Sequence, residues 1–450
     1  MPVTESNEAA VRRDRSIRLA VVTSLISKAG NILLQLVSIP VAFRVLGREE
    51  FGLYTTVSLT LTTIALLEIG VGPALTHGLS QARANHDSQR QRELGSTAFF
   101  LMVGLGLVAG ILVGGLLALV PVVKLYGSEF AGYESQLRAG LWMGLAIFVC
   151  LFVLNLTERA REGHLEVASN NLWGAIGNLT AAAAVAGGIW FVPQVWFLVL
   201  AVHGSMVLAK IGNTIALWRK HPLMRPSVGA FRPSLAKHLF GDGISFSTCF
   251  LVTGVVEYNF CGWLVGRIGG GPANVALYGI FISLTVMQLG FVIMLSTPTW
   301  PAVAEALTRG DLDWARKAAK RLYRFGMSFA LCSAVGMTLF GPWALHLWLG
   351  DRFGGTTHLA MGCYALYFVA HVWRHLNHAM MIGTGQVRRL AVIQIVESML
   401  MIGITTMVLW LGSMEFMLAA MGITILCLTG WLLPRRVAAV LGKQTVVENV

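Results

Sequence analysis

The sequence predicts an all-α polytopic membrane protein, with about twelve transmembrane helices arranged in two six-helix lobes around a central cavity. Three observations support this fold class: the composition, the length of the apolar blocks and the distribution of the basic residues. Of the 450 residues, 55% are hydrophobic and only 12% are charged, whereas a soluble domain carries about 25% charged residues. So few charges cannot cover a surface that faces water.

The apolar blocks are continuous, which favours helices over barrel strands. A helix needs about 20 apolar residues to cross ~30 Å of hydrocarbon, whereas barrel strands alternate over about ten residues. Polar residues interrupt the blocks at 357–380 and 388–411, but both are long enough to span. The predicted spans are residues 18–44, 50–76, 95–120, 138–156, 168–190, 193–217, 239–266, 273–299, 322–346, 357–380, 388–411 and 413–433.

The basic residues predict the orientation of these spans. With the N-terminus inside, most of the 34 Lys and Arg residues fall on inner segments. An excess of Lys and Arg on short inner loops is the positive-inside pattern, so we expect a bacterial inner-membrane protein with both termini in the cytoplasm. The basic residues of the outer segments are Arg44, Arg48, Lys124, Arg138, Arg267 and Arg352, and those inside spans are Lys28, Lys210 and Arg374.

A weak internal repeat divides the spans into two sets of six. An even number of helices per repeat makes the repeats parallel, so two such lobes can enclose a cavity near the middle of the membrane. At a constant offset, Gly47, Leu53, Tyr54, Asp87 and Arg92 fall on Gly271, Leu277, Tyr278, Asp311 and Arg316. The predicted organisation is a tail at 1–17, a lobe at 18–218, a linker at 219–238, a second lobe at 239–433 and a tail at 434–450.

Polar residues in the first lobe are candidates for lining the cavity, because ionisable groups inside a membrane usually face a cavity, a partner or water. Lys28, Asn31 and Gln35 share one face of the first span. Lys28 either lines the cavity or forms a structural ion pair with Glu68 of the second span. Lys210, in the sixth span, either lines the cavity or extends its amine to the cytoplasmic surface.

Three carboxylates inside spans are candidates for binding a coupling ion or for balancing a basic residue. They are Glu68, Glu257 and Glu397. Glu257 lies deepest in the seventh span and is the stronger candidate for a coupling ion. The alternative for Glu257 is a protonated carboxyl group that is hydrogen-bonded inside the bundle. Glu397 of the eleventh span is a candidate counter-charge for the basic residues of the tenth.

The tenth predicted span carries four basic residues on one face: His371, Arg374, His375 and His378. They follow the i, i+3, i+4, i+7 spacing of a helix face. The stripe either lines the cavity and binds an anionic ligand or meets lipid phosphates near the cytoplasmic surface. Two histidines three residues apart could also hold a metal, but no Cys or carboxylate stands beside them, so we expect no metal site.

Motifs for catalysis are absent from the sequence. It contains no GxxxxGK[ST] phosphate loop, no GxSxG turn and no HExxH. We therefore expect a protein that is not an enzyme and that needs no cofactor. The net charge of +12 is explained by orientation and by anionic lipids in the bilayer, so no nucleic-acid partner is expected.

Three stretches carry a family resemblance: LGREEFGLY after the first span, LLEIGVGPALTHGLSQARANHD around the end of the second, and GTGQVRRLAVIQIVESML before the eleventh. They resemble the polysaccharide transporter family, which comprises the O-antigen and exopolysaccharide flippases of the multidrug/oligosaccharidyl-lipid/polysaccharide exporter superfamily. The resemblance implies translocation of undecaprenyl-pyrophosphate-linked glycans by alternating access, together with a polysaccharide polymerase and export machinery. On this interpretation Lys28, Lys210 and Arg374 contact the anionic cargo.

Two other classes of function stay open. A cation-coupled multidrug exporter would have the same helix plan but would need acidic groups in its cavity. A membrane glycan polymerase or acyltransferase would be an enzyme. A polymerase is expected to have a large outer loop, which the sequence lacks, and an acyltransferase would need a catalytic histidine such as His371 or His375.

Overall fold

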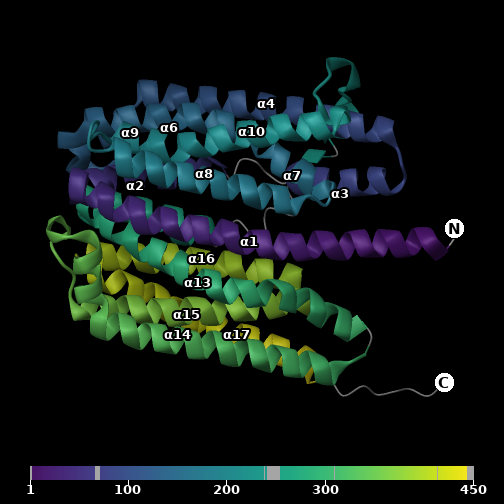
Figure 1. Ribbon diagram of the computed structural model, residues 1–450. Helices are drawn as coiled ribbons and strands as arrows, with labels where there is room; N and C mark the ends of the chain where they lie inside the picture. Colours follow the sequence, from purple (N-terminus) through teal and green to yellow (C-terminus); the bar gives the residue numbers. More distant parts are fainter. Residues whose placement is uncertain are drawn as a thin grey trace. The chain divides into compact units, whose positions relative to one another are not determined.

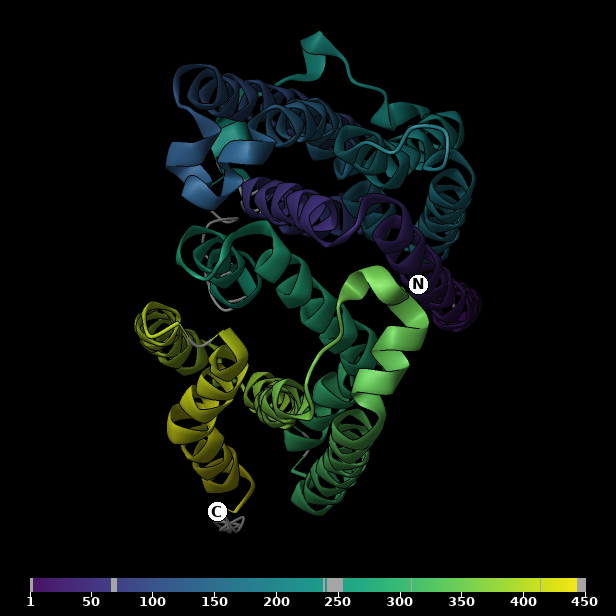
Figure 2. The same cartoon turned by 90° about the vertical axis from the view of Figure 1, so that its left-hand side faces the viewer.

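The computed structural model describes residues 3–65, 71–237, 239–240, 254–308, 310–412 and 414–442. These residues form helices joined by short turns, and no strand occurs in these ranges. The chain divides into two compact units, Met1–Thr248 and Cys249–Val450. Each unit is a bundle of roughly parallel and antiparallel helices (Figures 1 and 2).

The first unit contains the elements α1 (Val3–Leu46), α2 (Arg48–Ala65), α3 (Val71–Ala84), α4 (Ser88–Leu119), α5 (Val122–Tyr126), η2 (Ser128–Tyr133), α6 (Glu134–Leu154), α7 (Leu156–Gly163), α8 (Val167–Gly188), α9 (Val195–Val199), η3 (Leu200–Gly204), α10 (Ser205–Lys220), η4 (Pro222–Met224) and η5 (Val228–Ala230). Within it, α1 packs along α8, α8 packs on α10, and α4 and α2 pack on α6.

The second unit contains η6 (Val255–Phe260), α12 (Cys261–Ile268), α13 (Gly271–Thr308), α14 (Leu312–Leu349), η7 (Asp351–Phe353), α15 (His358–Gly383), α16 (Val387–Trp410) and α17 (Met414–Leu441). The helix α15 packs against α13, α14 and α17. It is therefore buried on several sides, and its aromatic residues Tyr364, Tyr367 and Phe368 belong to the core of this unit.

Residues that the sequence repeat pairs have the same local role in the two units. Gly47 and Gly271 both adopt a positive φ, 89° and 75°, which glycine reaches without steric cost. The side chain of Asp87 accepts a hydrogen bond from the backbone of Arg90 at the start of α4. Asp311 caps α14 in the same way, by accepting from the backbone of Trp314.

The predicted class of an all-α membrane protein is confirmed. Eight helices of the described part of the chain are long and apolar enough to cross a membrane. The number twelve stays a prediction. The other four predicted spans fall on α2 and α3, on α8, on η6 and α12, and on α15. Residues outside the described ranges interrupt the first and third of these.

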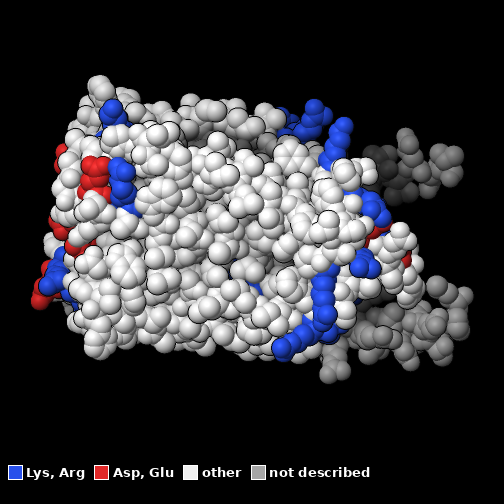
Figure 3. Space-filling view, turned by 90° about the horizontal axis from the view of Figure 1, so that it is seen from above, with Lys and Arg blue, Asp and Glu red and all other residues white. Residues whose placement is uncertain are grey.

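Charged side chains lie mainly at the two ends of the face drawn in Figure 3. Lys and Arg dominate one end, Asp and Glu are more frequent at the other, and the broad band between them is almost free of charge. Such a band is the surface expected of helices that contact hydrocarbon.

Candidate functional site

A buried carboxylate lies at the centre of a polar network in the second unit. Glu257 is 1% exposed and belongs to the π-helix η6. A π-helical turn widens the helix and often occurs at functional sites. The backbone carbonyl of Glu257 accepts a hydrogen bond from the hydroxyl of Tyr278, a residue of α13, so the turn is held from outside its own helix.

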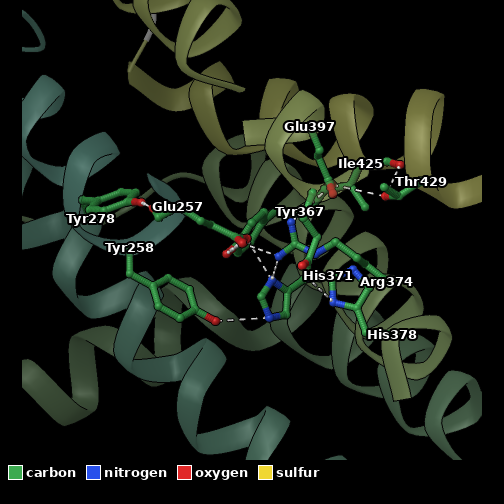
Figure 4. A network of polar contacts seen from close by, with 11 residues as sticks. Glu257, Tyr258, Tyr278, Tyr367, His371, Arg374, His378, Glu397, Ile425 and Thr429 are labelled. Carbon is green, nitrogen blue, oxygen red and sulfur yellow. Dashed lines mark hydrogen bonds and ion pairs between the residues drawn. The ribbon is translucent and has the colours of Figure 1, made fainter. Parts of the chain in front are cut away.

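Three side chains of α15 saturate this carboxylate (Figure 4). The Tyr367 hydroxyl donates to Oε1 at 2.6 Å, and His371 Nδ1 lies 2.8 Å from the same oxygen. Arg374 Nη2 donates to Oε2. The three residues follow the i, i+4, i+7 spacing of one helix face, so a single face of α15 supplies all three contacts.

Nδ1 of His371 has two neighbours, Oε1 of Glu257 at 2.8 Å and Nη2 of Arg374 at 2.9 Å. If Nδ1 carries the proton and donates to Glu257, then Nε2 is an acceptor. The hydroxyl of Tyr258 lies 3.1 Å from Nε2 and can donate to it. Both ring nitrogens of His371 are therefore used inside the network.

Arg374 joins the network to α16. Its side chain is 3% exposed, and while Nη2 binds Glu257, Nη1 lies 3.3 Å from Oε1 of Glu397. Glu397 is 0% exposed, and its Oε1 also lies 3.2 Å from the hydroxyl of Thr429 on α17. One guanidinium thus stands between two buried carboxylates from two different elements.

The four basic residues predicted on one face of α15 contact different neighbouring elements. His371 and Arg374 face Glu257, whereas His375 Nε2 lies 2.9 Å from the hydroxyl of Ser296 on α13. His378 is half-buried, and its Nδ1 lies 3.2 Å from the amide nitrogen of Gln394 on α16. The four side chains therefore connect α15 to η6, α13 and α16 within the second unit.

In the first unit, Lys210 of α10 forms an ion pair with Glu158 of α7. The lysine side chain is 13% exposed and that of Glu158 is 38% exposed. The carbonyl of Glu158 also accepts from the Asn170 amide at 2.9 Å. The sequence predicted that Lys210 either lines the cavity or extends its amine to the cytoplasmic surface, and it gave no sign of the pairing with Glu158.

The polar residues on one face of α1, Lys28, Asn31 and Gln35, are more accessible to solvent than the network of the second unit. Asn31 is exposed, and Lys28 and Gln35 are half-buried. The amide of Gln35 donates to Asn31 at 2.6 Å. The proposed partner Glu68 lies outside the described residues, so its pairing with Lys28 stays a prediction.

A second ionic cluster follows α7 in the first unit, outside the spanning segments. Glu166 lies 2.6 Å from Arg161, 2.7 Å from Lys220 and 2.8 Å from His221. Burial alone would raise the pKa of Glu166, but the hydrogen bonds and charges of Lys220 and His221 outweigh burial and lower that pKa. Burial lowers the pKa of the neighbouring His164, whose ring lies 4.2 Å from that of His221.

Sequence reasoning missed several members of the network. Tyr367 lies one turn before His371, so extending the basic stripe by four residues would have found it. Tyr258 and Thr429 gave no signal, because a hydroxyl on an apolar helix is common and its partner depends on packing. Among the described residues, no group of three or more His, Cys, Asp or Glu side chains could hold a metal ion.

The network is a buried set of contacts that joins η6, α15, α16 and α17. Most of its polar atoms bind one another, and none of the described contacts places a nucleophile beside a free base, the arrangement that covalent catalysis requires. Carboxylates, histidines and an arginine at such depth are instead typical of ion and substrate pathways in membrane proteins.

Comparisons with known proteins agree with this description. A protein-family model described as "Polysaccharide biosynthesis protein" matches residues 20–307, and no curated protein matches the sequence. An inward-facing multidrug resistance MATE family transporter of the MOP superfamily is similar in structure, with a TM-score of 0.78 and 15% identity over 94% of this chain and 99% of the other. A MOP superfamily transporter from Pyrococcus furiosus Vc1, described as having a binding pocket of reverse polarity that suggests a different function, has a TM-score of 0.67 and 15% identity, covering 96% and 97%. At such identity these structures show the fold alone.

Proposed function

The chain belongs to the polysaccharide biosynthesis protein family, and on that premise we propose that it is a flippase for surface polysaccharide biosynthesis. It translocates undecaprenyl-pyrophosphate-linked oligosaccharide units across the plasma membrane by alternating access. The family match, which covers residues 20–307, carries the proposal. The MOP-type fold supports transport as the activity.

The charge of such a cargo suits the basic residues of the spans. A pyrophosphate is an anion that lysine and arginine bind through charge-assisted hydrogen bonds. On this proposal Lys28, with Asn31 and Gln35 on the same accessible face of α1, forms the first contact surface. Lys210 contributes when it is released from Glu158. The described transporter with a binding pocket of reverse polarity supports the idea that pocket polarity differs among proteins of this fold.

The basic residues of α15 that bind neighbouring helices have a supporting role in this proposal. Because His371, Arg374 and His378 bind neighbouring side chains, they position the helices of the second unit. His375 and His378 are half-buried, whereas His371 and Arg374 are buried. The protein acts in the bacterial inner membrane with both termini in the cytoplasm, where a polysaccharide polymerase and export machinery use its product.

A cation-coupled multidrug exporter is the second candidate. The observation that favours it is the structural similarity to a multidrug resistance transporter. An exporter of cationic drugs would use the carboxylates of its spans to bind cargo. Here Glu257 is fully occupied by Tyr367, His371 and Arg374, which favours the flippase. The engagement of both His371 nitrogens likewise disfavours an acyltransferase.

Deletion of the gene tests the proposal. The deletion strain should lack a surface polysaccharide and should accumulate lipid-linked oligosaccharides on the cytoplasmic leaflet, and the intact gene should restore export. Unchanged polysaccharide in a strain without a redundant flippase would refute the proposal. Increased drug resistance on overexpression, with unchanged polysaccharide, would support the exporter instead.

A further inference from the structure

The network of the second unit contains two buried carboxylates and one arginine. Glu257 and Glu397 are 1% and 0% exposed, and Arg374 is 3% exposed. If both carboxylates were ionised while His371 was neutral, one negative charge would stay uncompensated in a site without contact to solvent. An uncompensated buried charge is strongly unfavourable, and a group in this position usually becomes neutral instead.

The partners are divided unequally between the two carboxylates. Glu257 receives hydrogen bonds on both oxygens, from Tyr367 and His371 on one and from Arg374 on the other. Glu397 has contacts on Oε1 alone, and its Oε2 is buried without a hydrogen-bond partner among the described residues. An ionised oxygen in that position would lose its hydration without compensation, so Glu257 is the better place for the negative charge.

The hydroxyl of Thr429 provides an independent argument. This group has one proton to donate, yet it lies 3.0 Å from the carbonyl of Ile425 and 3.2 Å from Oε1 of Glu397. Its one proton can form a full hydrogen bond with only one of these two oxygens (Figure 4). If Thr429 donates to Ile425, as helical threonines commonly do one turn back, the contact with Glu397 needs a proton from the glutamate.

The surrounding elements supply few other charges. The elements packed against α16 are α15, α17, α12 and η6. Their titratable groups at this depth are Tyr367, His371, Arg374, His375 and His378 of α15, Glu257 and Tyr258 of η6 and Cys261 of α12. Helix α17 contributes the hydroxyl of Thr429. The thiol of Cys261 lies 3.8 Å from Thr405 and is used there. Arg374 is therefore the one permanent cation of this set, and it already binds Glu257.

From these contacts we infer that Glu397 is a proton-binding site, in which a neutral carboxylic acid donates to Thr429 while Glu257 is the ionised partner of Arg374. Release of the proton creates a second carboxylate beside Arg374 Nη1. The guanidinium is then shared between Glu257 of η6 and Glu397 of α16, so proton binding at Glu397 is linked to the contact between η6 and α15. The site is independent of the identity of the cargo.

Infrared difference spectroscopy of the purified full chain in lipid tests this site. At pH 7 the wild type should show the C=O stretch of a buried protonated carboxylic acid. This band should disappear in Glu397→Gln. In Glu257→Gln it should weaken or disappear as well, because Arg374 has then lost its ionised partner and takes Glu397 as a carboxylate. A wild-type spectrum identical to that of folded Glu397→Gln, or a band that disappears in Glu257→Gln alone, would overturn the inference.

A second variant keeps the test decisive if Glu397→Gln does not fold. Thr429→Val has nearly the same shape but removes the acceptor of the glutamate proton. The band of the acid should then move to higher frequency, because its O–H has lost a partner, while Thr424→Val on the same helix should leave it in place. An unchanged band in Thr429→Val would contradict the inference.

Discussion

Arg374 and Glu257 form an ion pair between α15 and η6 in which both side chains are almost completely buried. The residues are 117 positions apart in the sequence. Their pairing holds the π-helical turn of η6 against α15, the helix that packs on α13, α14 and α17 of the second unit. Variants of either residue should therefore change the stability of this contact.

Arg374→Met should destabilise the second unit. Removing one partner of a buried pair leaves an uncompensated charge and typically costs about 3–5 kcal/mol. The unfolding midpoint of the purified protein in detergent should therefore fall. The double variant Glu257→Gln/Arg374→Met removes both charges and should recover much of the loss. If the double variant is as unstable as the sum of the two single variants, the pairing is not what stabilises this contact.

Gly422→Ala should separate α17 from α15. A Cβ on Gly422 would lie 2.9 Å from the Cα and 3.1 Å from the backbone nitrogen of Tyr367, and backbone atoms cannot move aside as a flexible side chain can. Small residues permit such close helix contacts in membranes, and we expect overpacking to cost about 1–3 kcal/mol.

Gly403→Ala is the matched control for this packing prediction. A Cβ on Gly403 of α16 meets no atom within 4 Å. Replacing glycine by alanine in an open helix position gains up to about 1 kcal/mol. Its unfolding midpoint should thus stay level or rise, and equal destabilisation by both variants would argue against close contact at Gly422.

Acidification should weaken the Glu166 cluster of the first unit. Because Lys220 and His221 lower the pKa of Glu166 in the folded protein, the unfolded chain binds the proton more tightly. The stabilisation is thus complete above the ordinary pKa of glutamate and is lost as the pH falls through the lowered value. Glu166→Gln should have a lower unfolding midpoint at pH 7 and a flatter decline in acid. A decline in acid as steep as that of the wild type would exclude this role.

Lys28→Glu should abolish export of the surface polysaccharide, because a reversed charge on the accessible face of α1 repels an anionic cargo. Lys28→Arg keeps the charge and should restore export in the deletion strain. Equal amounts of each variant in the membrane are the necessary control. Full export by Lys28→Glu would remove Lys28 from the proposed cargo site. Arg374→Glu is a poorer test, because it would place three carboxylates together in the core.

The sequence predicted the broad class of the protein correctly for a physical reason. The cost of placing charged or unpaired groups in hydrocarbon acts on each segment separately, so composition and apolar length reveal spanning helices without knowledge of their packing. The spacing of His371 and Arg374 likewise follows from the helical period, which is local. The Asp caps of α4 and α14 could also be recognised locally, because a cap bonds to its own helix.

The partners of those residues depended on tertiary structure. The sequence suggested Glu397 as the counter-charge of the stripe and Glu257 as a separate ion site, whereas the structure places Arg374 between the two. Lys210 is paired with Glu158, which lies beyond the end of the predicted fourth span. Hydropathy and helical period establish that a polar face exists. The partners that bind this polar face are determined by the packing of η6, α15, α16 and α17, because packing sets the distances between their charged groups.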